Sequence, residues 1–380
     1  MENLKEKCGI VGIYGKGLEI ARLTFFGLFA LQHRGQEASG MCVSDGEIMR
    51  LHKGAGLVSH AYTEETIEKL KGYIGIGHNR YSTSGASVLD HAQPVGYGMT
   101  KEDTSDHLFS FNDTMAFSLA HNGNLPSVKA LEEFLKQNNV FKNDRTDSEL
   151  VADAVGFYLE KGETLSEAVK KVYPLLTGAF AIVAMMKDTL VAIRDSHGMR
   201  PLSLGKINDG HIVVSETCAL KTLGAEFVRY VDPGEMVVIN EDGVESVKLA
   251  IATPHYDTFE FVYFARPDSV LEGKSVYEVR KKMGTILARE FVPGVDMIVP
   301  VPDTAFPVAI GYSKATGIPL EIALVKNRYV HRTFIEPTQK SRENSVALKL
   351  VPMPEVIAGK KIALIDDSIV RGTTSKRLVQ

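Results

Sequence analysis

The sequence predicts two domains, an α+β domain at residues 8–250 and an α/β domain at residues 251–380, after a short leader at residues 1–7. Three observations support this fold class. The chain of 380 residues is longer than one hydrophobic core usually serves. Its first part has many short apolar runs separated by turn residues, which is typical of a domain with many short strands. Its second part alternates buried apolar runs with helical segments, which is typical of a parallel sheet.

The composition is that of a globular protein, with 44% hydrophobic residues, 24% charged residues and a net charge of -4. Because there is no basic excess, nucleic acid is not expected as a partner. No apolar run is long enough to cross a bilayer, and the leader MENLKEK lacks the apolar core of a signal peptide. The three cysteines have neither metal-type nor disulfide-type spacing. We therefore expect a cytoplasmic protein without a membrane partner.

The first apolar run begins at a cysteine. Cys8 opens the segment CGIVGIYG, which alternates small and β-branched residues and is predicted to be a buried strand. A lone cysteine in such a place is usually a small hydrophobic residue. If residues 1–7 are removed, however, Cys8 becomes the N-terminal residue. Its α-amine, with a pKa of about 8, can then act as the base that activates the thiol. A helix is predicted next, at Leu18–Leu31.

Three polar segments lie at the ends of predicted elements. A strand runs through GIGHNRYSTSG into a hydroxyl-rich loop with Arg80 and Thr83, where an arginine suits a substrate carboxylate. Asn122 and Gly123 end another strand and can donate to a developing oxyanion. Asp147 lies in TDSE, a predicted helix N-terminus, and can equally bind a substrate ammonium. Taken singly, each segment also has a structural explanation, as a surface ion pair, a turn or an N-cap.

The rest of the first domain indicates fold more than chemistry. Leu175–Met185 and Thr189–Ile193 are predicted to pair as strands around a Lys-Asp turn. Pro233-Gly234 is predicted to be a turn that leads into a strand at Met236–Ile239. Cys218 follows a helix-start pattern and is interpreted as a packed thiol.

In the second domain a helix is predicted at Val276–Phe291, followed by strands at Asp296–Val301 and Leu320–Val325. The first of these strands leads to Thr304, where hydroxyl and backbone N–H groups can bind a pyrophosphate. The second leads to Lys326, which opens a polar, cationic segment that extends to residue 349. The composition of this segment fits a disordered loop, and it equally fits a flap that covers a site and excludes water.

The most specific stretch is KIALIDDSIVRGTTS near the end of the chain. Ile362–Ile365 is predicted to be a strand buried on both faces of a parallel sheet. Two carboxylates follow it, at the position where open α/β sheets bind ligands. A glycine-containing loop follows and leads into a predicted helix at Ser375–Val379. The loop, the helix start and the acidic pair together predict a phosphate-binding site with a place for a metal. The alternative is a helix cap followed by an ordinary turn. Because the loop lacks Gly-Lys-Ser/Thr, an ATPase is disfavoured.

The motifs CGIVGI, LQHRGQEASG, GHNRYSTSG, LAHNGN and TDSE, in this order, resemble the N-terminal-nucleophile glutamine amidotransferase domain. The resemblance implies an αββα sandwich, in which two antiparallel sheets lie between helical layers. It implies that Cys8 attacks the amide of glutamine and releases ammonia, and that Asn122 and Gly123 form the oxyanion hole. It also implies that Arg80 and Thr83 hold the substrate carboxylate and that Asp147 holds its ammonium group.

IDDSIVRGTTS resembles the 5-phosphoribosyl-1-pyrophosphate (PRPP) motif of type I phosphoribosyltransferases. Together with RPDS and KNRYVHRTFI, the two halves resemble the glutamine PRPP amidotransferase family. That family makes 5-phosphoribosylamine, glutamate and pyrophosphate, in the first committed step of de novo purine synthesis. The resemblance implies Mg²⁺ at Thr304, Asp366 and Asp367. The PRPP-binding residues it implies are Asp366, Asp367, Arg371, Gly372, Thr373, Thr374, Lys326 and Arg332.

Three features depart from the family pattern. His331 stands where a glycine is usual, which could slow closure of the flap. Some relatives hold an iron–sulfur cluster through a cysteine where this chain has Asp257, so we expect no cluster ligands here. The chain stops at Gln380, where a type I sheet should continue, and a truncated second domain is therefore expected. The alternatives are a PRPP-binding regulatory protein or a glutaminase alone. The resemblance further implies a homo-oligomer, a dimer or tetramer.

Overall fold

The computed structural model describes residues 8–81, 89, 91–98, 108–111, 113–327, 350–369 and 372–379. The chain divides into two compact units, with the division between Asp257 and Thr258. The division lies a few residues beyond the predicted boundary at residue 250, because the last residues of the first unit are bonded to it. The N–H of Thr253 donates to the carbonyl of Ser196 at 2.9 Å, and Asp257 forms an ion pair with Arg200 at 3.2 Å.

The first unit contains an eight-stranded antiparallel sheet, called sheet A here, in the order β12-β10-β11-β1-β4-β2-β3-β6. Its central strand is β1, which is hydrogen-bonded to β11 on one side and to β4 on the other. The strands of sheet A are β1 (Gly9–Tyr14), β2 (Ala38–Ser44), β3 (Met49–Ala55), β4 (Ile74–Arg80), β6 (Leu108–Phe111), β10 (Ser203–Ile207), β11 (Gly210–Val214) and β12 (Glu226–Tyr230).

A second antiparallel sheet, sheet B, has six strands in the order β14-β13-β9-β8-β7-β5. The predicted strand pair is confirmed as β8 and β9, although β8 begins at Ala179 because a 3₁₀ turn occupies Tyr173–Leu175. The strands of sheet B are β5 (Val95–Tyr97), β7 (Phe117–Asn124), β8 (Ala179–Met185), β9 (Leu190–Arg194), β13 (Glu235–Asn240) and β14 (Gly243–Lys248).

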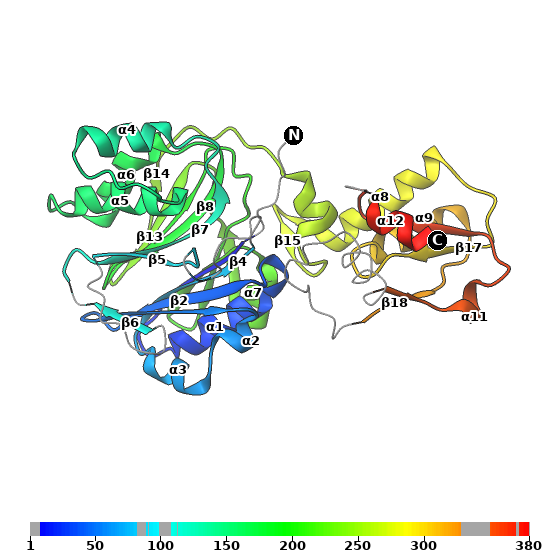
Figure 1. Cartoon of the computed structure of the whole chain (residues 1–380), viewed down its shortest axis with the longest axis horizontal. Helices are drawn as coiled ribbons and strands as arrows, with labels where there is room; N and C mark the ends of the chain where they lie inside the picture. The colour runs from blue at the N-terminus through cyan, green and yellow to red at the C-terminus, as the bar shows by residue number, and fades with distance from the viewer. Residues whose placement is uncertain are drawn as a thin grey trace. The chain divides into compact units, whose positions relative to one another are not determined.

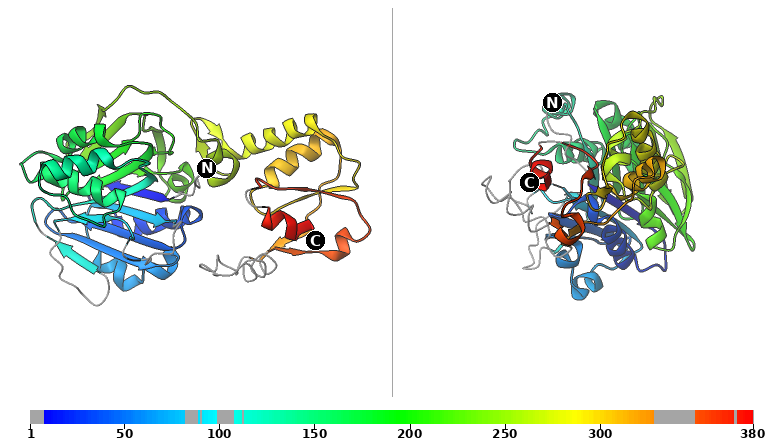
Figure 2. Two further views of the ribbon diagram at one scale, coloured as in Figure 1. Left: turned by 45° about the horizontal axis from the view of Figure 1, so that its top comes forward. Right: turned by 90° about the vertical axis from the view of Figure 1, so that its right-hand side faces the viewer.

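Helices cover the outer face of each sheet (Figure 1). On sheet A these are α1 (Ile20–Ala30), α2 (Val58–Ala61), α3 (Glu64–Lys69) and α7 (Thr217–Thr222), and on sheet B they are α4 (Lys129–Gln137), α5 (Asp147–Leu159) and α6 (Leu165–Val172). The two helical layers also stay on opposite sides of the paired sheets in the turned view of Figure 2. The first unit is therefore a four-layer sandwich, with helices outside and two sheets inside.

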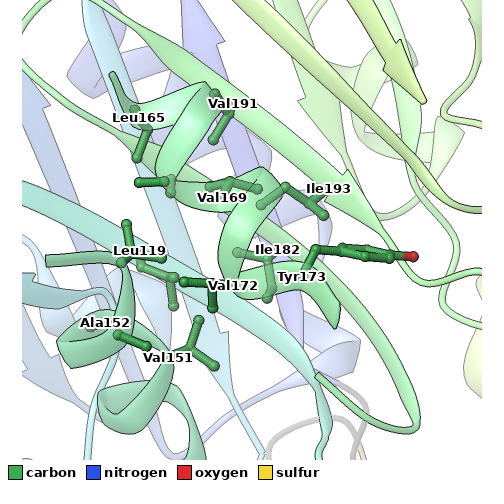
Figure 3. Close-up of a cluster of buried hydrophobic side chains, with 14 of the residues drawn as sticks. Leu119, Val151, Ala152, Leu165, Val169, Val172, Tyr173, Ile182, Val191 and Ile193 are labelled. Carbon is green, nitrogen blue, oxygen red and sulfur yellow. The ribbon is translucent and has the colours of Figure 1, made fainter. Parts of the chain in front are cut away.

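Three apolar layers hold the sandwich together. One lies between the sheets and contains Ile10 of β1 and Val183 of β8. The second lies between sheet B and its helices, where Val151, Val169 and Ile182 meet (Figure 3). The third lies between sheet A and its helices. Because both faces of each sheet are covered, the central strands β1, β4 and β7 are buried along nearly their whole length rather than at alternate positions.

Glycines in β4 let α1 approach sheet A closely. A Cβ atom at Gly75 would lie 2.5 Å from Cγ2 of Ile20, and one at Gly77 would lie 2.7 Å from Cγ2 of Thr24. Both distances are shorter than any real contact between such carbons. The pattern Gly-Ile-Gly in this strand therefore serves packing: the glycines face the helix, and Ile76 faces the inter-sheet layer.

The second unit is smaller, and its sheet is partly parallel. β17 and β20 pair in parallel, and Leu320 forms a further parallel bridge to Ile298 of β17. Its elements are a π-helix (Glu260–Phe264), β15 (Val270–Leu271), β16 (Lys274–Ser275), α8 (Val276–Glu290), β17 (Met297–Pro300), α9 (Phe306–Thr316), β18 (Leu324–Lys326), β19 (Leu350–Pro352), α11 (Pro354–Ile357), β20 (Ile362–Ile365) and α12 (Thr373–Val379).

Two expectations for this unit are wrong. The predicted strand at Leu320–Val325 is not one strand, because Leu320 bridges to β17 whereas β18 begins at Leu324 and pairs antiparallel with β19. β20 is not buried on both faces, because Ile362 is 37% exposed and only Ile365 is buried. Among the described residues β20 pairs with β17 alone, so that one edge and part of one face stay open.

None of the helices in the described part of the chain has both the length and the apolar character needed to cross a membrane.

Candidate functional site

Cys8 lies at the head of the central strand of sheet A. The side chain is buried, and Cys8 directly precedes Gly9, which pairs with Asn79, the residue before Arg80 at the end of β4. Ser215 holds the start of β1 on its other side. Its hydroxyl accepts from the N–H of Ile10 at 3.0 Å, and its own N–H donates to the carbonyl of Ile10 at 3.1 Å. A thiol and an arginine thus lie at the same end of two hydrogen-bonded strands.

Asn122 faces the inter-sheet layer near the end of β7. Residues two apart on a strand share a face, and Ala120 belongs to the inter-sheet cluster. The amide of Asn122 is fully buried, and neither Oδ1 nor Nδ2 has a hydrogen-bond partner among the described residues. Burying such a group without a partner costs about 1–3 kcal/mol. The unused hydrogen-bonding groups of this amide can pair with a bound ligand.

Gly123 follows with a conformation that favours glycine. Its φ is +154°, and a Cβ atom there would lie 2.3 Å from the carbonyl oxygen of Ala179 on β8. Any side chain would therefore push β7 away from β8 and displace the amide of Asn122. The two predicted oxyanion donors are adjacent on one strand, in a backbone that only glycine allows.

A histidine joins the two sheets at this end. His78 of β4 is fully buried, and its Nε2 lies 3.2 Å from the carbonyl oxygen of His121, to which it donates. Burial lowers the pKa of His78 to about 3, so the ring is neutral at physiological pH. This contact connects the strand that ends in Arg80 with the strand that carries Asn122.

Asp147 is brought to the same end by the start of α5. Thr146 is the N-cap, and it forms a capping box with Glu149, so the alternative that Asp147 itself is the N-cap is wrong. Oδ2 of Asp147 instead accepts from the N–H of Leu125 at 3.3 Å, directly after β7. The carboxylate is about a quarter exposed. It is placed to receive a cation from solvent near Gly123.

A buried ion pair beside Cys8 was not predicted. Arg34, in the 3₁₀ turn after α1, is fully buried, and its Nε donates to Oε1 of Glu216. The same oxygen lies 2.7 Å from Nε2 of His33. A Cβ at Gly9 would lie 3.5 Å from Cβ of Arg34, so the pair supports the residue next to Cys8. In the sequence, only the polar run LQHRGQ indicated a special role for this turn. No local pattern indicates that Glu216, far along the chain, is the partner of Arg34.

The first site therefore combines five predicted residues from four elements. They are Cys8, Arg80, Asn122, Gly123 and Asp147. The remaining predicted residue, Thr83, lies outside the described residues, as does the leader at residues 1–7. These residues have the chemical groups that the predicted roles require: a thiol, an amide with a neighbouring backbone N–H, a guanidinium and a carboxylate.

A second group of polar residues lies in the second unit, at the carboxyl ends of its parallel strands. Because β17 and β20 are parallel, Thr304 after β17 and the acidic pair after β20 lie at one edge. The hydroxyl of Thr304 donates to Oδ2 of Asp367. Oδ1 of Asp366 accepts from the N–H of Asp367 at 2.9 Å. The three predicted metal-site residues are thus in direct contact.

The electrostatics of this group suit a divalent cation. Burial raises the pKa of Asp366, and the charge of Asp367 raises it further. A cation bound here would relieve both effects. Carboxylate and hydroxyl oxygens are also the ligands that Mg²⁺ accepts. The residues present therefore fit the implied magnesium ion.

Lys326 lies beside the same strand ends. At the end of β18, its ammonium forms an ion pair with Asp303, the residue before Thr304. Gly372, with a φ of +71°, ends the loop and leads into α12 at Thr373. Three parts of the predicted PRPP site lie outside the described residues: Arg371, Arg332, and the side chains of Thr373 and Thr374.

Comparison with known proteins agrees with the predicted glutamine amidotransferase domain and the predicted PRPP-binding unit. Residues 99–222 match the family model described as a glutamine amidotransferase domain. Solved structures with the same fold include the glutamine PRPP amidotransferase from B. subtilis complexed with ADP and GMP. That chain is 38% identical with a TM-score of 0.85, and the match covers 98% of this chain and 78% of that one. Another, described as the allosteric regulatory enzyme of purine biosynthesis, is 39% identical with a TM-score of 0.87, covering 98% and 77%.

The fold and the first site thus define a glutamine amidotransferase with a second, α/β unit. Relatives named amidophosphoribosyltransferase extend the likeness over nearly the whole chain. The one from Synechococcus elongatus is 43% identical and is matched over 99% of this chain and 75% of its own length. The one from Methanocaldococcus jannaschii is 42% identical, with 98% and 80% covered. The chain belongs to the amidophosphoribosyltransferase family and is an enzyme.

Proposed function

We propose that this chain transfers the amide nitrogen of glutamine to PRPP, giving 5-phosphoribosylamine, glutamate and pyrophosphate. This is the first committed step of de novo purine (IMP) biosynthesis. The observation that carries the proposal is the buried amide of Asn122, which has no hydrogen-bond partner among the described residues, at the end of the sandwich where Cys8 lies. A glutamine carbonyl held there would be attacked by the thiol while its oxygen receives the amide N–H. The names of the family's members support PRPP as the acceptor.

The first half-reaction uses the first unit. After loss of residues 1–7, the α-amine of Cys8 takes the thiol proton, and Sγ attacks the amide carbon of glutamine. Nδ2 of Asn122 and the N–H of Gly123 stabilise the oxyanion. The α-ammonium returns the proton to the departing nitrogen, which leaves as ammonia, and water hydrolyses the thioester to glutamate. Arg80 pairs with the substrate carboxylate, and Asp147 pairs with its ammonium group.

The second half-reaction uses the second unit. Asp366 and Asp367 hold the ribose end of PRPP, and Gly372 and the start of α12 receive the 5-phosphate. Ammonia attacks C1 of the ribose as the bond to pyrophosphate breaks. Thr304, Asp366 and Asp367 would hold Mg²⁺, which offsets charge on the leaving pyrophosphate when bound. Lys326 adds a cation at the same edge.

The test replaces the nucleophile and compares two nitrogen sources. Cys8→Ala should abolish glutamate release and glutamine-dependent synthesis, and ammonia-dependent synthesis should continue because the second unit is intact. The matched control is Cys42→Ala, since burial raises the pKa of the Cys42 thiol to about 12 and makes it unreactive. The intact mass shows whether residues 1–7 are absent. Retained glutamine use in Cys8→Ala would refute the assignment. If the unaltered protein releases glutamate but forms no pyrophosphate from PRPP, the protein is a glutaminase without transferase activity.

A further inference from the structure

The side chain of Gln93 makes a hydrogen bond to β7 beyond the point where the neighbouring strand β5 begins. β5 pairs with β7 from Val95 opposite Leu119, and the same register would place Gln93 opposite His121. β5 does not extend that far. Instead, Oε1 of Gln93 accepts from the backbone N–H of His121 at 2.7 Å. The strand is thus held by a side chain directly before the two oxyanion donors.

The other end of the same amide reaches α5. Nε2 of Gln93 donates to Oγ of Ser148 at 3.0 Å. Ser148 is buried and follows Asp147, and its hydroxyl donates to Oδ1 of Asp147 at 3.2 Å. Oγ of Ser148 also lies 3.1 Å from Nδ1 of His121. If Nδ1 carries the proton of a neutral His121 ring, all of these contacts have one donor and one acceptor.

The charges around His121 favour this neutral ring. Burial lowers the pKa of His121, and the charge of Arg200 in the loop after β9 lowers it further, while Asp147 opposes them. His78 of β4 also faces this residue, through its contact with the backbone carbonyl. A protonated His121 would lie next to Asp147, since Nδ1 is 3.7 Å from Oδ2. It would then compete with a substrate ammonium for that carboxylate.

We infer that Gln93 is a positioning residue for glutamine, which fixes the oxyanion donors of β7 relative to the ammonium-binding carboxylate of α5. The inference rests on the proposed function. One planar amide connects the two elements, and both of its partners, His121 and Ser148, are buried. Substrate contacts at both ends of glutamine therefore depend on it, although Gln93 touches neither end itself.

The first test is Gln93→Leu, which keeps the approximate volume and removes both hydrogen bonds. We expect kcat/KM for glutamine to fall about 10- to 100-fold through a lower kcat and a higher KM, because both subsites shift. Ammonia-dependent synthesis should stay at the wild-type rate. Gln137→Leu, at an exposed position at the end of α4, is the matched control and should change neither rate.

The second test is Gln93→Glu, which keeps an oxygen for the N–H of His121 and adds a negative charge. The added carboxylate should raise the pKa of His121, because it favours the charged ring. KM for glutamine in this variant should then rise at acidic pH, because its ring takes up a proton at a higher pH than the wild-type ring does. The wild-type KM should stay constant over that range. A role in packing alone would not produce this pH dependence.

The outcomes separate the inference from the function on which it rests. An active wild-type protein with wild-type glutamine kinetics in Gln93→Leu overturns the inference alone. If Gln93→Leu does not fold, the Gln93→Glu profile decides, and a KM that does not depend on pH overturns the inference. A wild-type protein that releases no glutamate from glutamine overturns the proposed function and the inference together.

Discussion

At the scale of single residues, the proposed role of Asn122 in the oxyanion hole predicts opposite effects on stability and on activity. A buried amide without a partner lowers stability, so Asn122→Ala should leave the melting temperature unchanged or raise it. The same change should lower kcat for glutamine about 100- to 1,000-fold, because one oxyanion donor is lost. Steady-state kinetics and thermal unfolding of the variant measure the two effects.

Asn138 provides the matched comparison for this prediction. Its Nδ2 donates to the carbonyl of Phe134 at the end of α4, at 2.8 Å, so its amide is used by the fold. Asn138→Ala should therefore lower the melting temperature slightly and leave kcat for glutamine unchanged. Equal kcat values in the wild type and Asn122→Ala would remove Asn122 from the oxyanion hole.

At the scale of elements, the site depends on how β4 is held against β7. The hydrogen bond from His78 to the carbonyl of His121 crosses between the sheets, and it requires a neutral ring. The folded-state pKa of His78 is about 3, whereas the unfolded chain titrates at about 6.5. Between these values the unfolded state binds the extra proton, so stability is lost as the pH falls below about 6.5.

This linkage predicts an acid-sensitive first unit. Between pH 7 and pH 5, His78 alone should reduce the free energy of unfolding by about 2 kcal/mol. Urea unfolding at the two pH values, followed by a probe in the first unit, measures the change. In His78→Gln, an amide N–H can still reach the carbonyl but does not titrate, so the pH dependence should weaken. An identical pH dependence in the variant would show that other groups are responsible.

At the scale of the whole molecule, the proposed function assigns separate half-reactions, linked by ammonia, to the two units. Asp367→Asn should lower the rate of phosphoribosylamine formation at least about 100-fold with either glutamine or ammonia, because it weakens the metal and ribose contacts. Glutamate release at Cys8 should persist. Asp209→Asn, in an exposed turn of the first unit, is the control and should affect neither reaction. A wild-type ammonia-dependent rate in Asp367→Asn would exclude Asp367 from the site.

Local patterns were enough for most elements, whereas the roles of the named site residues were predicted from the order of motifs that resembles a known family. The strand that begins after Cys8, the helix start at Thr146 and the strand before Asp366 were predicted correctly, because each has a local signal. The error at Leu320–Val325 has a physical reason. A short apolar run does not specify its partner, and here its two ends pair with different strands.

The sequence by itself predicted which residues carry the chemistry, because its motifs in their order resemble a known family, whereas each residue taken singly also has a structural explanation. Only the tertiary structure decided how they are supported. Glu216 meets Arg34, and Gln93 joins His121 to Ser148, across large separations in the chain. Buried side-chain hydrogen bonds of this kind leave no periodic pattern, because they depend on which elements the packed sheets bring together. The supporting contacts therefore become visible only after the sheets have packed.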